Sequence, residues 1–324
     1  MILMKMKNDI PKRKDGGIKW NFRPVNQEEL EACLKDPLWR VCSGALYKII
    51  IKGDDKKEKK GDDKKPKEDL VVFFQPNRSQ KRLLANLWHR NVILKARQLG
   101  FTTLICILWL DTALFSENMR CGIIAQDREA AEVIFRDKVK FAYENLPEHL
   151  KNGMPLARDS ATELLFAHNN SSIRVATSMR SGTIHRLHIS EFGKICAKYP
   201  DKAKEVVTGS IPAVPKSGIL IIESTAEGRE GEFYDITMRA KAAKDTAKEL
   251  TVRDYRFHFF AWWDANEYEM PVDSVKLTDK DNAYFARIEA QIGQPISLEK
   301  RAWYIATRDA DFSGSEEKMW QEYP

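Results

Sequence analysis

Three short, largely apolar runs in this chain each end in a cluster of polar residues. The runs span residues 92–94, 187–189 and 219–222, and the clusters after them begin with Lys95, Ser190 and Glu223. Apolar runs of this length are typical of strands buried on both faces of a parallel sheet, and the stretches between them are long enough for crossover connections. Because open α/β sheets bind ligands beyond the carboxyl ends of their strands, the pattern predicts that the three clusters lie at one edge of such a sheet.

The spacing of apolar positions elsewhere predicts helices and further strands around these three. Predicted helices cover 27–35, 80–88, 128–145, 202–208 and 232–248, and one follows the first strand as far as residue 115. Predicted strands cover 121–125, a hairpin of 164–166 and 173–177, and a second hairpin of 45–51 and 70–74. Residues 255–263 are apolar on both alternating faces, which favours a central buried strand over a platform for stacked bases. The order of these elements predicts an α/β fold.

The first strand runs into a sequence that matches part of a phosphate-binding loop. Against the pattern G-x-x-x-x-G-K-[ST], Gly100 and Thr102 match, whereas Phe101 stands at the lysine and Lys95 at the first glycine. Such loops direct backbone N–H groups, the start of a helix and one ammonium group at phosphate oxygens. Lys95 and Arg97 supply positive charge from the front of the turn. A strand, a glycine turn and a helix also occur in many α/β proteins that bind no nucleotide, and on this segment alone that alternative stays open.

The polar residues after the other two strands suit a site for a nucleoside triphosphate. Glu191 follows the second strand, where a carboxylate is placed to orient or activate an attacking water. Thr225 follows the third strand, where it is placed to respond to the state of the γ-phosphate. The alternative for Glu191 by itself is a carboxylate that begins a helix. The order of the three segments along the chain favours the triphosphate site over that alternative.

As an ordered set, these segments resemble the ATPase domain of the large terminase subunit, the motor that drives DNA into the capsids of tailed bacteriophages. Residues 96–103 resemble its Walker A loop, 187–192 its Walker B segment and 221–228 its coupling motif. Further matches are 171–175 and 180–183, before Walker B, and 232–236, at the helix after the coupling strand. The resemblance covers about residues 70–324.

The resemblance implies a P-loop NTPase fold of three layers, with a mainly parallel central sheet of the additional-strand, catalytic-glutamate type and a small N-terminal subdomain. It implies a lid-like N-terminal segment over 1–70, an ATPase core over 71–264 and a helical segment over 265–324. In the family that last segment leads toward a nuclease domain, and we expect no nuclease domain in this chain. Residues 52–69 are almost wholly charged residues, glycine and proline, so we expect a disordered loop there.

The resemblance also implies ATP and Mg²⁺ as cofactors and gives roles to residues of all three segments. Glu191 acts on the attacking water, Arg97 stabilises the transition state in cis, and Thr225 couples hydrolysis to motion. Thr102 and Ser190 are the expected metal-contacting residues. The expected nucleotide-binding residues are Gln80, which reads adenine, and the loop residues Lys95, Ala96, Arg97, Gln98, Leu99, Gly100, Phe101, Thr102 and Thr103.

Two residues depart from the pattern of the family. Phe101 replaces the usual lysine, although some members use a lysine at the start of the loop, where Lys95 lies. Ser190 replaces the aspartate that normally holds Mg²⁺ through water. Because Mg²⁺ keeps several waters in such sites, a neutral outer partner is tolerable, and we expect weaker metal binding as the consequence.

By resemblance, the function is that of an ATP-hydrolysing double-stranded DNA translocase domain of a viral genome-packaging terminase, in the cytoplasm of the bacterial host. The implied partners are double-stranded DNA, a portal protein, a small terminase subunit and further copies of the chain in a ring. Three alternatives are a nucleotide-binding scaffold with a degenerate site, a helicase-like repair ATPase and a small-molecule kinase. The helicase is disfavoured because the sequence after Asp264 holds no second phosphate loop. The kinase is disfavoured because no lid-like arginine cluster accompanies the phosphate loop.

Composition changes this picture little. The net charge of +6 suits a polyanionic partner but is modest for 324 residues. No apolar run reaches the roughly 18 residues that a membrane span needs, so no membrane partner is expected. The five cysteines form no C-x-x-C pair, and the close pair His185 and His188 lacks two further ligands at the spacing of a zinc site. We therefore expect reduced thiols and no metal-ligating histidines.

Overall fold

The computed structural model describes residues 10–51, 70–180 and 182–324. The loop expected to be disordered at 52–69, and Ser181 in the segment before Walker B, lie outside the described residues. The chain divides into two compact units that alternate along the sequence. None of the helices in the described ranges has the length and apolar character that crossing a bilayer requires.

The main sheet has eight strands in the order β10-β3-β9-β8-β4-β7-β6-β5. β10, β3, β9 and β8 pair in parallel, whereas β5, β6 and β7 pair antiparallel. This confirms the expected α/β fold with a mainly parallel sheet, and the hairpin expected near residues 164–177. The strands are β3 (Arg90–Lys95), β4 (Arg120–Ile124), β5 (Leu156–Asp159), β6 (Glu163–Phe166), β7 (Ser172–Ala176), β8 (Arg186–Ser190), β9 (Ile219–Ser224) and β10 (Tyr255–Phe260).

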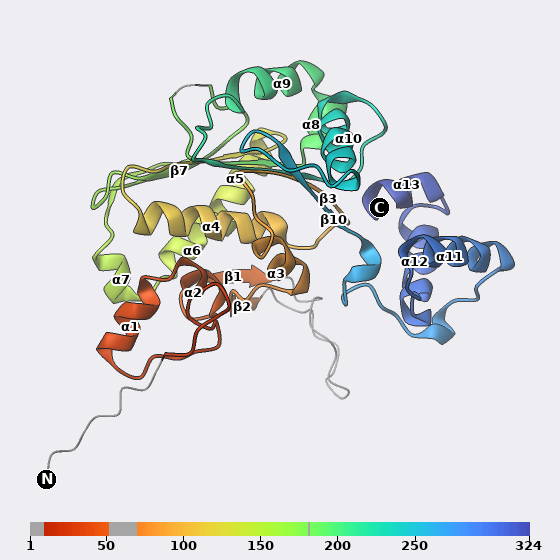
Figure 1. Ribbon diagram of the computed structural model, residues 1–324, viewed down its shortest axis with the longest axis horizontal. Coiled ribbons are helices and arrows are strands. Elements are labelled where there is room, and N and C mark those ends of the chain that lie inside the picture. Colours follow the sequence, from red (N-terminus) through yellow and green to blue (C-terminus); the bar gives the residue numbers. More distant parts are fainter. Residues whose placement is uncertain (1–9, 52–69, 181) are drawn as a thin grey trace, which may run out of the picture. The chain divides into compact units, whose positions relative to one another are not determined.

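One unit contains the four parallel strands β10, β3, β9 and β8 and the C-terminal helices. In this unit, which holds the candidate site, α8 and α10 pack against each other, and α10 also packs against β3 and β10 (Figure 1). Its helices are α3 (Arg78–Leu84), α8 (Phe192–Lys198), α9 (Pro200–Glu205), α10 (Gly231–Asp245), α11 (Asp279–Ile292), α12 (Leu298–Asp311) and α13 (Glu316–Glu322), with short helical turns at Val206–Ser210, Trp262–Asp264 and Val272–Ser274.

The other unit contains the N-terminal elements and most of the helix that follows the phosphate loop. Its antiparallel pair of β1 (Lys48–Ile51) and β2 (Leu70–Phe73) confirms the second expected hairpin. A fully buried network holds this unit together, because Asp111 accepts hydrogen bonds from Arg40 and from the Tyr47 hydroxyl. Its helices are α1 (Gln27–Leu34), α2 (Pro37–Cys42), α4 (Phe101–Phe115), α5 (Arg128–Ile134), α6 (Phe141–Glu144) and α7 (Glu148–Asn152), with a π-helical turn at Phe135–Lys140 that joins α5 to α6.

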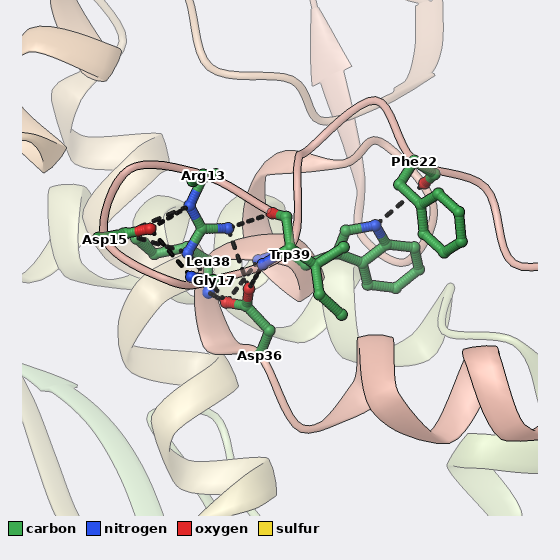
Figure 2. A network of polar contacts seen from close by, with 8 residues as sticks. Arg13, Asp15, Gly17, Phe22, Asp36, Leu38 and Trp39 are labelled. Carbon is green, nitrogen blue, oxygen red and sulfur yellow. Dashed lines mark hydrogen bonds and ion pairs between the residues drawn. The ribbon is translucent and has the colours of Figure 1, made fainter. Parts of the chain in front are cut away.

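Asp36, at the start of α2, is hydrogen-bonded to the N-terminal loop that contains Arg13 and Ile18 (Figure 2). Its Oδ1 accepts hydrogen bonds from the N–H groups of Leu38 and Trp39, at 3.0 and 3.2 Å. Its Oδ2 accepts from the N–H of Ile18 at 2.6 Å and from the Arg13 guanidinium at 3.0 Å. One carboxylate therefore caps the helix and fixes the loop.

Asp36→Ala is expected to lower the free energy of unfolding by about 2 kcal/mol, the upper end of the range for a helix N-cap. The reason is that the variant loses the helix cap and the loop contacts together. Urea unfolding followed by circular dichroism measures this loss. Asp15→Ala, which removes an exposed ion pair from Arg13, is the control and is expected to leave the stability almost unchanged. Equal losses in the two variants would contradict the prediction.

The strand expected at 255–263 differs from the observed one in length and position. β10 ends at Phe260, and it lies at the edge of the sheet, so the expectation of a central strand is wrong. The strand is apolar on both faces for another reason, which is that both faces of this edge strand are covered. The Phe260 ring lies 4.6 Å from that of Phe101, and on the opposite face Phe257 lies under Lys244 of α10.

His258 of β10 is buried in its neutral form. Its Nε2 lies 3.0 Å from Oδ1 of Asn91. Burial, and then the positive charges of Arg256, Lys244 and Arg82, lower the pKa of His258 to about 4. A buried imidazole with such a pKa resists protonation in the folded state.

The stability of the protein is therefore expected to fall as the pH is lowered from about 6.5, the ordinary histidine value, toward 4. In that window the unfolded chain binds a proton at His258 that the folded chain does not, and the slope reaches about 1.4 kcal/mol per pH unit. Urea unfolding at pH 7, 5.5 and 4.5 measures the slope. His258→Gln should flatten it, and His149→Gln, at an exposed position, should not. Equal slopes in the parent and in His258→Gln would contradict this account.

Candidate active site

The carboxyl ends of three parallel strands bring polar side chains to one place. β8 and β9 pair in a register that sets Ser190 opposite Glu223. β3 pairs with β9 on its other side, with Leu94 opposite Ser224. Lys95 is the last residue of β3, and its side chain reaches Glu223 of β9 and Glu191, the residue after β8. The predicted meeting of the three polar clusters is therefore observed for Lys95, Ser190 and Glu223.

Lys95 lies between two carboxylates. Its Nζ is 2.8 Å from Oε1 of Glu191 and 3.2 Å from Oε2 of Glu223. The side chain of Lys95 is 6% exposed, that of Glu191 25% and that of Glu223 0%. Lys95 and Glu191, which the sequence places in one site, are thus in direct contact.

The charges in this cluster shift the pKa values of Lys95 and Glu223. Burial alone would lower the pKa of Lys95, but the carboxylates of Glu223 and Glu191 outweigh it and hold that pKa above its usual value. Burial alone would raise the pKa of Glu223, but the Lys95 charge, followed by His188 and Ser190, holds it well below its usual range. Lys95 and Glu223 therefore stabilise each other in their charged forms.

Glu191 occupies a turn that few residues adopt. Its φ is 52° and its ψ is 45°, in the left-handed region, between the end of β8 and the start of α8. A non-glycine residue in this region is uncommon, and such residues are concentrated at functional sites. The Glu191 side chain makes no capping hydrogen bond to α8. The alternative in which it serves only to begin a helix is therefore not supported.

A glycine lets α8 approach the strand beside it. A Cβ at Gly193 would lie 2.8 Å from Oγ of Ser224 and 3.2 Å from the carbonyl oxygen of Thr225. At 2.8 Å the Ser224 hydroxyl would have to shift, because real Cβ atoms essentially never lie within 3.0 Å of another heavy atom, and the 3.2 Å contact with the carbonyl oxygen is tighter than most. The turn at Glu191 and the coupling segment are therefore held together by close backbone packing.

The phosphate loop is a tight turn between β3 and α4. Gln98 and Gly100 both have positive φ, at 59° and 72°, and α4 begins at Phe101. Gln80 lies under this turn, where its Nε2 donates to the carbonyl of Gly100 at 2.7 Å. A Cβ at Gly100 would lie 2.8 Å from that nitrogen, so glycine is required for this contact as well as for the positive φ. Gln80 thus braces the loop, and its role with adenine stays a prediction.

Phe101 explains why the usual lysine is absent from its position. The side chain is 1% exposed and its ring packs against Phe260. This position points into the core, where an ammonium would be unpaired, whereas Lys95 at the front of the loop lies between two carboxylates. Ala96 and Leu99 of the loop are also buried. Thr102 and Thr103 lie in the first turn of α4, where Thr103 Oγ1 accepts from Lys138 at 2.9 Å.

Arg97 contacts the C-terminal end of the chain. Its N–H donates to the carbonyl of Glu322 at 3.0 Å, and its guanidinium lies 3.7 Å from the Glu322 carboxylate. The Tyr268 hydroxyl donates to the carbonyl of Arg97. The Arg97 side chain is 49% exposed, so it remains accessible to a ligand.

The coupling segment after β9 contacts Gln321, the residue before Glu322 in α13. The N–H of Ala226 donates to the carbonyl of Gln321 at 3.0 Å, and Gln321 Nε2 donates to Glu227 at 2.7 Å. Thr225, which the sequence assigns to coupling, is fully buried just before these contacts. The phosphate loop and the coupling segment therefore share α13 as a common neighbour.

Sequence reasoning missed three residues of this arrangement. Glu223 was part of the coupling segment but had no assigned role, although a charged residue that directly ends an apolar strand is unusual. Glu322 lies far from every motif in the sequence, and nothing local marks it. His188 also belongs to the cluster, with Nε2 3.4 Å from Oε1 of Glu223, in a fully buried position.

The oxygen atoms around Glu191 suit a hard cation such as Mg²⁺. The buried oxygens that lack a hydrogen-bond partner among the described residues include Glu191 Oε2, Ser224 Oγ and Thr225 Oγ1. Carboxylate and hydroxyl oxygens are the ligands that Mg²⁺ prefers, usually one or two of them with phosphate oxygens and water. Within the described ranges, no group of three or more His, Cys, Asp or Glu residues could hold a metal alone. These residues therefore fit a metal that arrives with a phosphate ligand rather than one bound by protein groups only.

Comparisons with known proteins bear on the fold. No protein-family model matches the chain, and no curated protein matches its sequence. Among solved structures, the large terminase ATPase domain of Thermus phage P74-26 aligns over 77% of this chain and 93% of that one, with a TM-score of 0.50 and 17% identity. The large terminase of bacteriophage HK97 aligns over 73% and 46%, with a TM-score of 0.48 and 16% identity. A DEAD box protein from Methanococcus jannaschii aligns over 72% and 69%, with a TM-score of 0.34 and 14% identity.

The first of these matches covers almost the whole of that ATPase domain. At 17% identity it concerns the fold, and it agrees with the resemblance found from the sequence motifs. The chain has the P-loop fold of a large terminase ATPase domain.

Proposed function

We propose that this chain hydrolyses ATP and uses the energy to move double-stranded DNA during the packaging of a viral genome. The observation that carries the proposal is the contact between Lys95, at the end of β3, and Glu191, at the end of β8, at 2.8 Å. It puts a cation for phosphate and a carboxylate for water at the edge where α/β sheets bind ligands. The fold of a terminase ATPase domain supports the same conclusion.

In this proposal each charged group has a separate task. Lys95 and Arg97 bind phosphate oxygens, and Arg97 stabilises the charge that develops in the transition state. A triphosphate competes with Glu191 for Lys95, and the released carboxylate then orients a water and accepts its proton. Thr102 and Ser190 would lie toward Mg²⁺, which would neutralise charge on the phosphates, and Thr225 couples hydrolysis to motion.

The remaining expectations are part of the same proposal. The partners are double-stranded DNA, a portal protein, a small terminase subunit and other copies of the chain in a ring, in the cytoplasm of a bacterial host. Packaging motors of this kind complete their sites with a neighbouring subunit, so we expect weak turnover from the isolated chain. A high rate that does not depend on protein concentration would contradict the ring.

A scaffold with a degenerate site is the second candidate, because Lys95 is already paired with two carboxylates. Phosphate release from ATP, with and without double-stranded DNA, tests the choice. The proposed function predicts release above the Glu191→Gln background and a higher rate with DNA. Binding of ATP with no release above that background would establish the scaffold instead.

Arg97→Ala is expected to reduce turnover by roughly 10³-fold, the lower end of the range for an arginine that acts on the transition state. ATP binding should change little, because Lys95 retains the ground-state contact with phosphate. Isothermal titration with a non-hydrolysable analogue measures binding, and phosphate release measures turnover. Arg253→Ala, at an exposed arginine outside the site, is the control. A loss of binding that accounts for the whole loss of rate would give Arg97 a ground-state role instead.

A further inference from the structure

Ser190, at the end of β8, stands where the family pattern has an aspartate. The neighbouring strand β9 carries a carboxylate, Glu223, directly opposite Ser190. The Ser190 Oγ donates to Oε1 of Glu223 at 2.8 Å. The hydroxyl is therefore directly connected to a negative charge on the neighbouring strand.

Glu223 is unusual for a residue with only a structural role. It is fully buried, and burial of an ionised carboxylate is costly unless close partners compensate it. Its partners are Lys95 Nζ at 3.2 Å, the Ser190 hydroxyl at 2.8 Å and His188 Nε2 at 3.4 Å. Lys95 already has Glu191 at 2.8 Å, so the second carboxylate is not required to neutralise it. Glu223 therefore places a second, fully buried carboxylate beside Lys95.

The direction of the hydrogen bond matters for what Ser190 can do. A hydroxyl has one hydrogen to donate and two lone pairs that accept. Because the hydrogen of Ser190 is given to Glu223, both lone pairs are available, and the adjacent charge makes the oxygen a stronger acceptor. Outer groups that hold a ligand residue in this way tune metal binding in many proteins.

We propose that Glu223, acting through the Ser190 hydroxyl, supplies the negative charge toward Mg²⁺ that an aspartate at position 190 would otherwise supply. Ser190 and Glu223 together then replace one residue, with the oxygen on β8 and the charge on β9. Glu223 is a positioning residue, because it acts on the metal through Ser190. This inference rests on the proposed function, since the metal arrives with the nucleotide.

Binding of Mn²⁺ in the presence of a non-hydrolysable ATP analogue tests the proposal, with free Mn²⁺ measured by electron paramagnetic resonance. Glu223→Gln keeps the size of the side chain and removes its charge. We expect it to weaken Mn²⁺ binding roughly 10- to 100-fold, the usual effect of an outer-shell change. Glu230→Gln, at an exposed carboxylate outside the site, is the matched control and should bind Mn²⁺ like the parent.

Moving the charge separates this role from a structural one. Ser190→Asp combined with Glu223→Gln restores a carboxylate at the end of β8 and should recover Mn²⁺ binding to within a few-fold of the parent. Ser190→Ala should weaken binding as Glu223→Gln does, and the double variant Ser190→Ala/Glu223→Gln should be no weaker than either, because the two residues act in series. Thermal melting confirms that each variant is folded.

The possible failures are distinguishable. Unchanged Mn²⁺ affinity in folded Glu223→Gln would overturn the inference and leave the proposed function intact. A folded Ser190→Asp/Glu223→Gln variant that does not recover binding would also overturn it, and this holds even if Glu223→Gln alone fails to fold. A parent chain that binds no ATP analogue at all would overturn both.

Discussion

Glu191→Gln is expected to slow ATP hydrolysis by roughly 10²- to 10⁴-fold, the contribution of a positioned general base, while ATP still binds. Glutamine keeps the length of the side chain and can hold a water, but it cannot accept the proton. The fold should tolerate the change, because Glu223 remains 3.2 Å from Lys95 and keeps that ammonium paired. Phosphate release under single-turnover conditions measures the chemical step, and titration with a non-hydrolysable analogue measures binding.

The matched control for this experiment is Glu230→Gln, an exposed carboxylate at the start of α10 that makes no capping hydrogen bond. It should hydrolyse ATP like the parent. If Glu191→Gln lost ATP binding and rate by the same factor, Glu191 would have a role in binding rather than in activating water. Retention of full turnover in Glu191→Gln would remove the carboxylate from the reaction.

Local patterns were sufficient to predict the strands that form the site and the residues at their ends. Lys95 and Ser190 each follow an apolar run directly, Glu191 comes next after Ser190, and parallel pairing then brings these residues to one edge of the sheet. The exchange of lysine for phenylalanine in the loop was also visible in the sequence. The reason for the exchange was not visible, because Phe101 packs against Phe260, which lies 159 positions later in the chain.

Contacts that depend on strand order or on the chain end could not be derived from local patterns. β10 is apolar on both faces, as a central strand would be, because helices cover both its faces. Its place at the edge of the sheet depends on which strands pair. The pairing of Ser190 with Glu223 depends on the register of β8 against β9, which a sequence alone does not fix. The contact of Glu322 with Arg97 requires the fold of all the helices between them.

Removal of the Lys95 ammonium should destabilise the folded chain at neutral pH more than any other single change in the site. Lys95→Met leaves Glu223 fully buried without its cation, and breaking a buried ion pair in this way costs about 3–5 kcal/mol. Met is similar in length and apolar, so the loss reports the unpaired charge rather than a cavity. Urea unfolding at pH 7 measures it.

The pH dependence of this variant should have the opposite sign to that of the parent site. In the parent, the pKa of Glu223 is held below its unfolded value, so the stability that it contributes is present above about pH 4.3 and is lost as the pH falls through the folded pKa. In Lys95→Met, burial acts without the cation and raises that pKa above the unfolded value. The contribution is then fully present below about pH 4.3 and is lost as the pH rises through the folded pKa.

The double variant Lys95→Met/Glu223→Gln tests whether the unpaired carboxylate is the cause. It should recover much of the stability that Lys95→Met loses, because no buried charge is left without a partner. Lys194→Met is the control: its ammonium is 3.8 Å from Glu191, and its side chain is 23% exposed, so a much smaller loss is expected. If Lys95→Met were as stable as the parent at pH 7, or if the double variant were no more stable than Lys95→Met, the buried charges at the strand ends would not govern the stability of this site.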